Sequence, residues 1–126
     1  MLTAPQTYGA LAGYKPIASI NGFDGVDTNY SFGVYSIHSM PTAVNAVYMF
    51  CKLQNNNYVP LYVGKADNLH SRLAGHERID EAVRLGATHL LVHSPGFGAR
   101  VSYLEAERRL IAQYNPVLNV QHRTRM

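Results

Sequence analysis

Apolar runs and polar interruptions divide the middle of the chain into strand-like segments. Residues 46–50 and 61–64 are rich in β-branched and aromatic side chains, and the polar, turn-forming residues 54–60 separate them. This pattern predicts a β-hairpin whose turn lies within residues 54–60. Residues 87–93 form another apolar run, which the Pro and Gly residues that follow interrupt, and they are predicted to form a third strand.

Helix signals lie between and after these strands. Helices are predicted over residues 67–75, 79–85 and 99–114. Asp67 is a suitable N-cap for the first helix, Gly86 stops the second, and Asn115 followed by Pro116 ends the third.

Together these elements predict an α/β (α+β) domain over residues 44–126, built on a small three-stranded antiparallel sheet flanked by helices. Residues 1–43 are rich in Gly, Pro, Ser, Asn and Tyr. They are predicted to be an N-terminal extension that packs on the core, with one or two short strands where the sequence alternates around residues 30–37. A chain of 126 residues, 47% of them hydrophobic, fits one domain.

Composition favours a protein of the reducing cytoplasm. The single cysteine, Cys51, excludes an internal disulfide. No apolar stretch approaches the ~20 residues that a membrane helix needs, so no membrane association is predicted. The formal net charge is +3 and the pI is about 9.1, a modest excess that favours a polyanionic partner. The basic residues that we take as candidates for contacting nucleic acid are Lys65, Arg72, Arg108 and Arg109.

Reactive side chains recur through the predicted hairpin and helices. They are Tyr48, Tyr62, Lys65, Arg72, His76, Glu107 and Asn119. A phosphodiester resists hydrolysis until a water is activated, the charge on the phosphorane is neutralised and the leaving alkoxide is stabilised. Glu107 offers a hard oxygen ligand, and because it is the one carboxylate of the set, we expect a single Mg²⁺ or Mn²⁺ that keeps several waters. Glu105 is a weaker candidate, because it points to another face of the helix.

The other members of the set have distinct candidate roles. Arg72 can donate to phosphate oxygens, and His76, four residues later on the same predicted helix face, can position or deprotonate water. Tyrosine, with a pKa near ~10, is a poor base unless a cation favours its phenolate, and Lys65 lies three residues after Tyr62. Either tyrosine is open as the base, and the other would be a packing residue. Asn119 can bond phosphate or fix the water network.

In this order, the residues resemble the GIY-YIG nuclease family over about residues 44–122. Ala46-Val47-Tyr48 is similar to its first signature and Tyr62-Val63-Gly64 to its second. Residues 65–73 resemble its arginine helix, most closely in the N-terminal nuclease domain of bacterial excision-repair incision subunits. Residues 107–111 and Asn119 resemble its glutamate helix and closing asparagine.

The first signature departs from the family's at one position, and a second tripeptide of the chain competes for it. The family's leading glycine is replaced by Ala46, which is harmless in a strand unless the position has φ > 0. Gly33-Val34-Tyr35 spells the signature better, but Tyr35 precedes Tyr62 by 27 residues whereas Tyr48 precedes it by 14. A short hairpin fits only Tyr48, so Tyr35 is interpreted as a strand residue of the extension.

The resemblance implies a metal-dependent DNA endonuclease of the cytoplasm that uses one Mg²⁺ or Mn²⁺, with a tyrosine helping to deprotonate the nucleophile. DNA repair is one compatible role. The partner is DNA of single-stranded, duplex or branched form, with a homodimer or a protein partner as a further source of selectivity. Two alternatives stay open: a non-catalytic nucleic-acid-binding module of the same fold, and a nuclease that acts on RNA.

Overall fold

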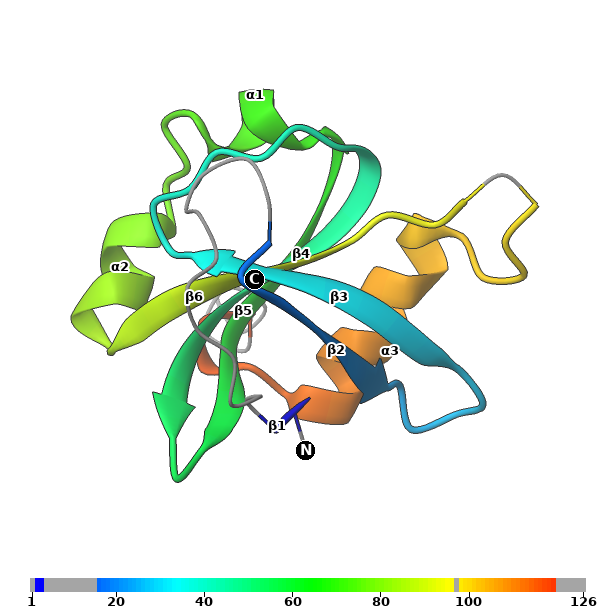
Figure 1. Cartoon of the computed structure of the whole chain (residues 1–126), viewed down its shortest axis with the longest axis horizontal. Coiled ribbons are helices and arrows are strands. Elements are labelled where there is room, and N and C mark those ends of the chain that lie inside the picture. The colour runs from blue at the N-terminus through cyan, green and yellow to red at the C-terminus, as the bar shows by residue number, and fades with distance from the viewer. Residues whose placement is uncertain (1, 4–15, 97, 120–126) are drawn as a thin grey trace.

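The computed structural model describes residues 2–3, 16–96 and 98–119. Within them, six antiparallel strands form one sheet in the order β1-β5-β4-β6-β3-β2 (Figure 1). The strands are β1 (Leu2–Thr3), β2 (Ala18–Phe23), β3 (Asn29–Ser36), β4 (Val44–Gln54), β5 (Asn57–Asn68) and β6 (Ala87–His93). The helices are α1 (Leu69–Leu73), α2 (Ile79–Arg84) and α3 (Tyr103–Tyr114).

The predicted fold class, a small three-stranded sheet flanked by helices, is wrong. β4, β5 and β6 contain the predicted hairpin and third strand, but β2 and β3 continue the same sheet. β3 joins it by pairing with β6, from Gly33 opposite Val92 to Ser36 opposite His89. Residues 18–36, predicted to lie in an extension packed on the core, are therefore part of the sheet itself. Residues 4–15 and 120–126 of the two predicted segments lie outside the described residues.

The sheet curls until its outermost strands nearly meet, so it is almost closed into a barrel. β1 pairs with the start of β5, with Leu2 opposite Tyr58, and β2 is the outer strand on the other side. A Cβ atom on Gly22 of β2 would lie 2.6 Å from Cδ2 of Leu2. Glycine at this position thus allows the two outer strands to approach each other.

The β4–β5 hairpin is longer and tighter than predicted. Its turn consists of Asn55 and Asn56, with φ of 52° and 63°, and asparagine is one of the few residues that tolerate this left-handed region. The residues that follow, predicted to be loop, already pair with β4. The register shifts between Phe50 and Cys51, where Pro60 sits at an irregularity that proline can occupy without losing a ladder hydrogen bond.

Both faces of the sheet are covered, which explains why β4 is buried on both sides along its centre. Val47, Met49 and Cys51 belong to a core that includes residues of α3. Tyr48 and Phe50 belong to a second core, on the side of α1 and α2. Figure 1 shows α2 and α3 on opposite sides of the sheet.

The helices are shorter than predicted. The N-cap of α1 is Asn68, whose side chain accepts a hydrogen bond from the Ser71 N–H, while Asp67 accepts one from the Tyr103 hydroxyl of α3. α3 begins after Ser102, which caps it through the Glu105 N–H. Among the described residues, no helix is long and apolar enough to cross a membrane.

Candidate functional site

Tyr48 lies at the centre of the candidate site, on β4, with 0% of its surface exposed. Its partner across the strand pair is Gly64 of β5. A Cβ atom on Gly64 would come within 2.6 Å of the Tyr48 Cζ and Oη atoms. The glycine is thus required because the Tyr48 ring lies across the β5 backbone at this point.

The Tyr48 hydroxyl is held by His76, at 2.7 Å from Oη to Nε2. His76 Nδ1 accepts a hydrogen bond from the backbone N–H of Arg78, at 3.0 Å. Burial, followed by the nearby Arg72, lowers the pKa of His76 to about 4, so the ring is neutral at neutral pH. Because Nδ1 accepts, the proton of the neutral ring is on Nε2, and His76 donates to Tyr48.

The four-residue spacing predicted that Arg72 and His76 lie on one helix, and this prediction is wrong. α1 ends at Leu73, and Gly75 follows with φ of 70°, a conformation that favours glycine. This turn carries His76 back over the sheet, where its ring contacts Phe50 at a centroid distance of 4.9 Å. The turn, rather than a helix face, brings His76 to the site.

Tyr62 is the more accessible tyrosine of the pair. It is half-buried on β5, stacks on Phe50 at a centroid distance of 5.7 Å and lies 6.2 Å from the Tyr48 ring. Burial raises the pKa of Tyr62, and the guanidinium of Arg72 opposes that rise. Burial and, to a smaller extent, Tyr62 raise the pKa of Tyr48. The positive charge of Arg72 lowers this pKa, but by less than either of them raises it. Of the two, Tyr62 is therefore better suited to meet a water and to lose a proton.

Arg72 projects from α1 beside this aromatic group and forms two hydrogen bonds with the carboxylate of Glu77, of 2.6 and 3.2 Å. It also lines an open pocket together with Lys65, Asn68 and Ser71. Asp67 lines the same pocket, but the two cationic side chains exceed its single carboxylate, so the pocket is suited to an anionic ligand such as phosphate.

Glu107 approaches from α3 and is half-buried. Burial raises the pKa of Glu107, and the positive charge of Lys65 opposes this rise. The negative charge of Glu107 in turn raises the pKa of Tyr62. No hydrogen bond or ion pair to its carboxylate is present within the described part of the chain. Because the described residues contain no buried side-chain oxygen without a partner, the Glu107 carboxylate is in contact with solvent and is open to a ligand.

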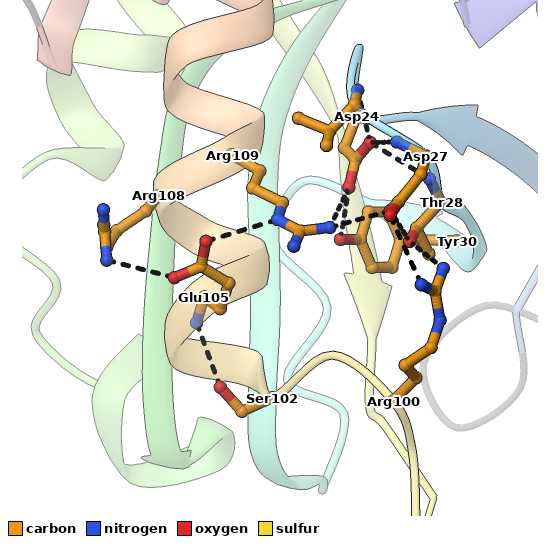
Figure 2. Close-up of polar contacts among 10 residues, drawn as sticks. Asp24, Asp27, Thr28, Tyr30, Arg100, Ser102, Glu105, Arg108 and Arg109 are labelled. Carbon is orange, nitrogen blue, oxygen red and sulfur yellow. Dashed lines mark hydrogen bonds and ion pairs between the residues drawn. The ribbon is translucent and has the colours of Figure 1, made fainter.

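Glu105, the competing carboxylate, is engaged elsewhere. It pairs with Arg108 at 3.0 Å and with Arg109 at 3.3 Å on the same helix. Figure 2 shows Glu105 between the two arginines, with Arg109 pointing toward Asp24 and Asp27 and Arg108 on the other side of α3. The preference for Glu107 over Glu105 thus agrees with the separate surroundings of the two side chains.

The edge of β5 organises the site. Tyr62 pairs opposite Phe50 and Lys65 opposite Val47, residues of the two different cores, so Tyr62 and Lys65 project to opposite faces at this edge. Asn119 closes the edge between them: its side chain accepts from the Val63 N–H at 2.8 Å and donates to the Val63 carbonyl at 2.9 Å. Asn119 therefore fixes the β5 backbone next to Tyr62, and both of its polar atoms are used there.

The donor set is compatible with one hard divalent cation. The described residues contain no group of three His, Cys, Asp or Glu side chains placed to hold a metal. Glu107 is half-buried, acts on Tyr62 and interacts with Lys65. Glu77 also acts on Tyr62, but it is paired with Arg72, whereas Glu107 has no ion-pair partner in the described chain. Mg²⁺ is commonly held by one or two carboxylates with waters completing its coordination, so Glu107 fits that use.

The structure separates Arg109 from the other predicted residues. Its guanidinium lies between Asp24, Asp27 and Glu105, at 3.2, 3.0 and 3.3 Å (Figure 2). Arg108 is on the surface of α3, beside Glu105. Of the four predicted nucleic-acid contacts, Lys65 and Arg72 share the pocket and Arg108 is exposed.

The backbone conformation at Ala46 and the position of Tyr35 bear on the choice of Tyr48 as the first tyrosine. Ala46 is not among the residues with positive φ, and the left-handed position is Asn45, with φ of 51°. The missing glycine is therefore tolerated. Tyr35 is a strand residue of β3, as predicted, with β6 and β4 between it and β5.

Sequence reasoning missed Phe50 and Glu77. Phe50 could have been found, because alternate residues of a strand share a face and Phe50 is two positions from Tyr48. Glu77 gave no periodic signal, because a turn brings it to Arg72.

Comparison with protein-family models, with curated proteins and with solved structures finds no match to this chain.

Proposed function

We propose that the chain is a metal-dependent endonuclease that hydrolyses a phosphodiester bond of DNA with one Mg²⁺ or Mn²⁺. One observation carries the proposal: Tyr62, the accessible tyrosine, is influenced by Arg72 of α1, which can bind phosphate, and by Glu107 of α3. Glu77 acts on Tyr62 as well, but its carboxylate is held by Arg72, whereas Glu107 has no hydrogen bond or ion pair within the described chain. The resemblance of the same residues to the GIY-YIG family supports the same chemistry.

Tyr62 is the general base in this proposal, because it is the tyrosine that solvent can reach. Arg72 favours its phenolate form and so helps it accept a proton from the attacking water. Tyr48 and His76 are positioning residues: the His76 Nε2–H donates to Tyr48, and the Tyr48 ring is in turn packed beside Tyr62. Burying both in neutral form keeps this arrangement rigid without adding charge.

Arg72 and Lys65 hold the phosphate in this proposal. The planar fork of Arg72 can donate to two non-bridging oxygens, and Lys65 adds a second charge in the same pocket. Glu107 would hold the cation, which supplies Lewis-acid stabilisation of charge on the phosphoryl and leaving oxygens. Asn119 keeps the β5 edge in place through Val63.

The test is a cleavage panel with a matched pair of tyrosine variants. Labelled single-stranded, duplex and branched DNA and single-stranded RNA are incubated with wild-type protein in Mg²⁺, Mn²⁺ or EDTA. We expect metal-dependent cutting of at least one DNA substrate, loss of cutting in Tyr62→Phe, and retention in Tyr35→Phe. Binding without cutting would instead support the non-catalytic module, and cutting of RNA alone would support the RNA nuclease.

A further inference from the structure

The phosphate-binding fork of Arg72 is already occupied by a carboxylate of the same chain. Arg72 Nη2 lies 2.6 Å from Glu77 Oε2 and Arg72 Nη1 lies 3.2 Å from Glu77 Oε1. This is the two-point geometry in which a guanidinium binds either a carboxylate or two oxygens of a phosphate. A phosphodiester that binds Arg72 in this way has to displace Glu77 first.

The pair lies where a ligand can reach it. The side chain of Arg72 is 34% exposed and that of Glu77 is 63% exposed. The Arg72 hydrogen bonds lower the pKa of Glu77 to about 2, so its carboxylate is ionised at every pH at which the protein is expected to work. The competitor is therefore permanent rather than switched by pH.

The alternative is that the pair only tethers the turn between α1 and α2. That turn has other anchors: the His76 N–H donates to the Leu73 carbonyl at 3.2 Å, and the His76 ring is fixed by Tyr48 and by the Arg78 N–H. An exposed ion pair adds little stability to a turn held in this way. Glu77 can leave Arg72 by rotating its own side chain, with His76 staying in place.

We propose that Glu77 is an intramolecular competitor for the phosphate site at Arg72, which sets how strongly an anion must bind to open that site. The inference rests on the proposed function, because it assigns Arg72 to phosphate. A polyanion that also contacts Lys65 in the adjoining pocket can offset the loss of the pair. A single free phosphate or a short cleaved end competes less well, so the competitor favours intact strands over products.

The experiment compares Glu77→Gln with Asp80→Asn, which also removes one exposed acidic charge near by but has no ion pair within the described chain. Binding of labelled single-stranded and duplex oligonucleotides is measured in EDTA, in the wild-type and Arg72→Ala backgrounds. We expect Glu77→Gln to bind about two- to fivefold tighter, more than Asp80→Asn does, with the difference abolished by Arg72→Ala. Equal effects of the two variants, or a gain that persists without Arg72, would overturn the proposal.

A second readout separates this inference from the proposed nuclease activity. Inorganic phosphate is titrated into ¹⁵N-labelled protein while the Arg72 Nε–H signal is followed by NMR. We expect the Glu77→Gln signal to shift at lower phosphate concentration than the wild-type signal. If no oligonucleotide binds to any variant, the proposed function fails while this titration still decides the role of Glu77. An unchanged titration in a variant with wild-type melting behaviour would contradict the competitor.

Discussion

Two carboxylates beside helix α3 have opposite surroundings: Asp24 follows β2 and contacts the helix through Arg109, whereas Glu107 is on the helix itself. Asp24, buried beside α3, accepts hydrogen bonds from three backbone N–H groups, from the Tyr30 hydroxyl and from Arg109 (Figure 2). Glu107 has no such partner among the described residues. The positive charge of Lys65 lowers its pKa and so favours its ionised form. A carboxylate whose oxygens are hydrogen-bonded by the protein stabilises the fold, whereas one that is open to solvent and has no protein partner is free to bind a ligand.

The pKa directions express the same difference. Burial opposes ionisation at both carboxylates. At Asp24, hydrogen bonds from Val26, Tyr30 and Thr28 outweigh burial, and the pKa falls well below its ordinary range. At Glu107 burial prevails, and the pKa rises. Perturbed carboxylates are found in both structural networks and functional sites, and its hydrogen bonds make Asp24 part of a structural network.

A large loss of cleavage is expected at Arg72, the residue of α1 that is proposed to hold the phosphate. Arg72→Ala should lower the cleavage rate about 10²- to 10³-fold, because it removes the preorganised donors for phosphate charge. Single-turnover rates with saturating protein measure this directly. Arg108→Ala is the control, because it removes a charge from the surface of α3, and its rate should change by less than about tenfold. Equal losses in both variants would mean that Arg72 contributes only general electrostatic attraction.

Asp24→Asn tests the satisfied side. An amide leaves one acceptor oxygen where two were used, and its NH₂ group would face the Arg109 guanidinium, so the free energy of unfolding should fall by about 2–4 kcal/mol. Urea unfolding at neutral pH measures this. Cleavage per folded molecule should be unchanged, and a lost rate in a fully folded variant would show that this network also controls catalysis.

Acid titration sharpens the result for Asp24. Because its folded pKa is depressed, its contribution to stability is fully present above an unfolded pKa near ~4 and is lost as the pH falls below that value. The wild-type protein should therefore lose more stability than Asp24→Asn when the pH is lowered through this range. Urea midpoints of both proteins, measured along a pH series, test this expectation. Parallel curves for the wild type and Asp24→Asn would contradict it.

Gly64→Ala tests the packing under the site. The added Cβ would clash with the Tyr48 ring, and overpacking of this kind costs about 1–3 kcal/mol. We also expect the Tyr48–His76 hydrogen bond to be disturbed, which the NMR signal of the His76 ring would report. Gly96→Ala is the control, because a Cβ there meets no atom within 4 Å. Similar melting temperatures for both variants would argue against the close approach of Tyr48 to β5.

The pH dependence of cleavage tests the assignment of the base without any substitution. The pKa of His76 is about 4, so this residue should give no inflection near the ordinary histidine value of ~6.5. A tyrosine base with a raised pKa should instead make the rate climb by up to about tenfold per pH unit through the neutral range. A plateau that begins near pH 7 would identify a histidine-type base instead.

The local elements were predictable where short-range pattern decides them. β6 agrees with the predicted third strand, α2 lies within its predicted range, and α3 ends at the predicted Asn115. The number of strands was not predictable in the same way, because β3 joins the sheet by pairing with β6, more than fifty residues away in sequence. The near-closure through Leu2 and Gly22 is another non-local contact with no local signal.

The candidate site was predictable in composition more than in geometry. The choice of Tyr48 over Tyr35 followed from hairpin length, which local sequence reveals. The route of His76 through the Gly75 turn, and the pairing of Arg72 with Glu77, depend on how a short helix ends and could not be read from a four-residue spacing. The use of Arg109 by Asp24 depends on β2 and β3 belonging to the sheet.

Cleavage by Glu107→Gln and Glu105→Gln, which alter two carboxylates of one helix, tests whether Glu107 holds the metal. Both variants lose one negative charge, but Glu105 is already paired with Arg108 and Arg109, whereas Glu107 has no hydrogen bond or ion pair within the described chain. In Mg²⁺ or Mn²⁺, we predict that Glu107→Gln abolishes cutting while keeping DNA binding, and that Glu105→Gln cuts as the wild type does. Full activity in Glu107→Gln, or equal loss in both, would contradict the account.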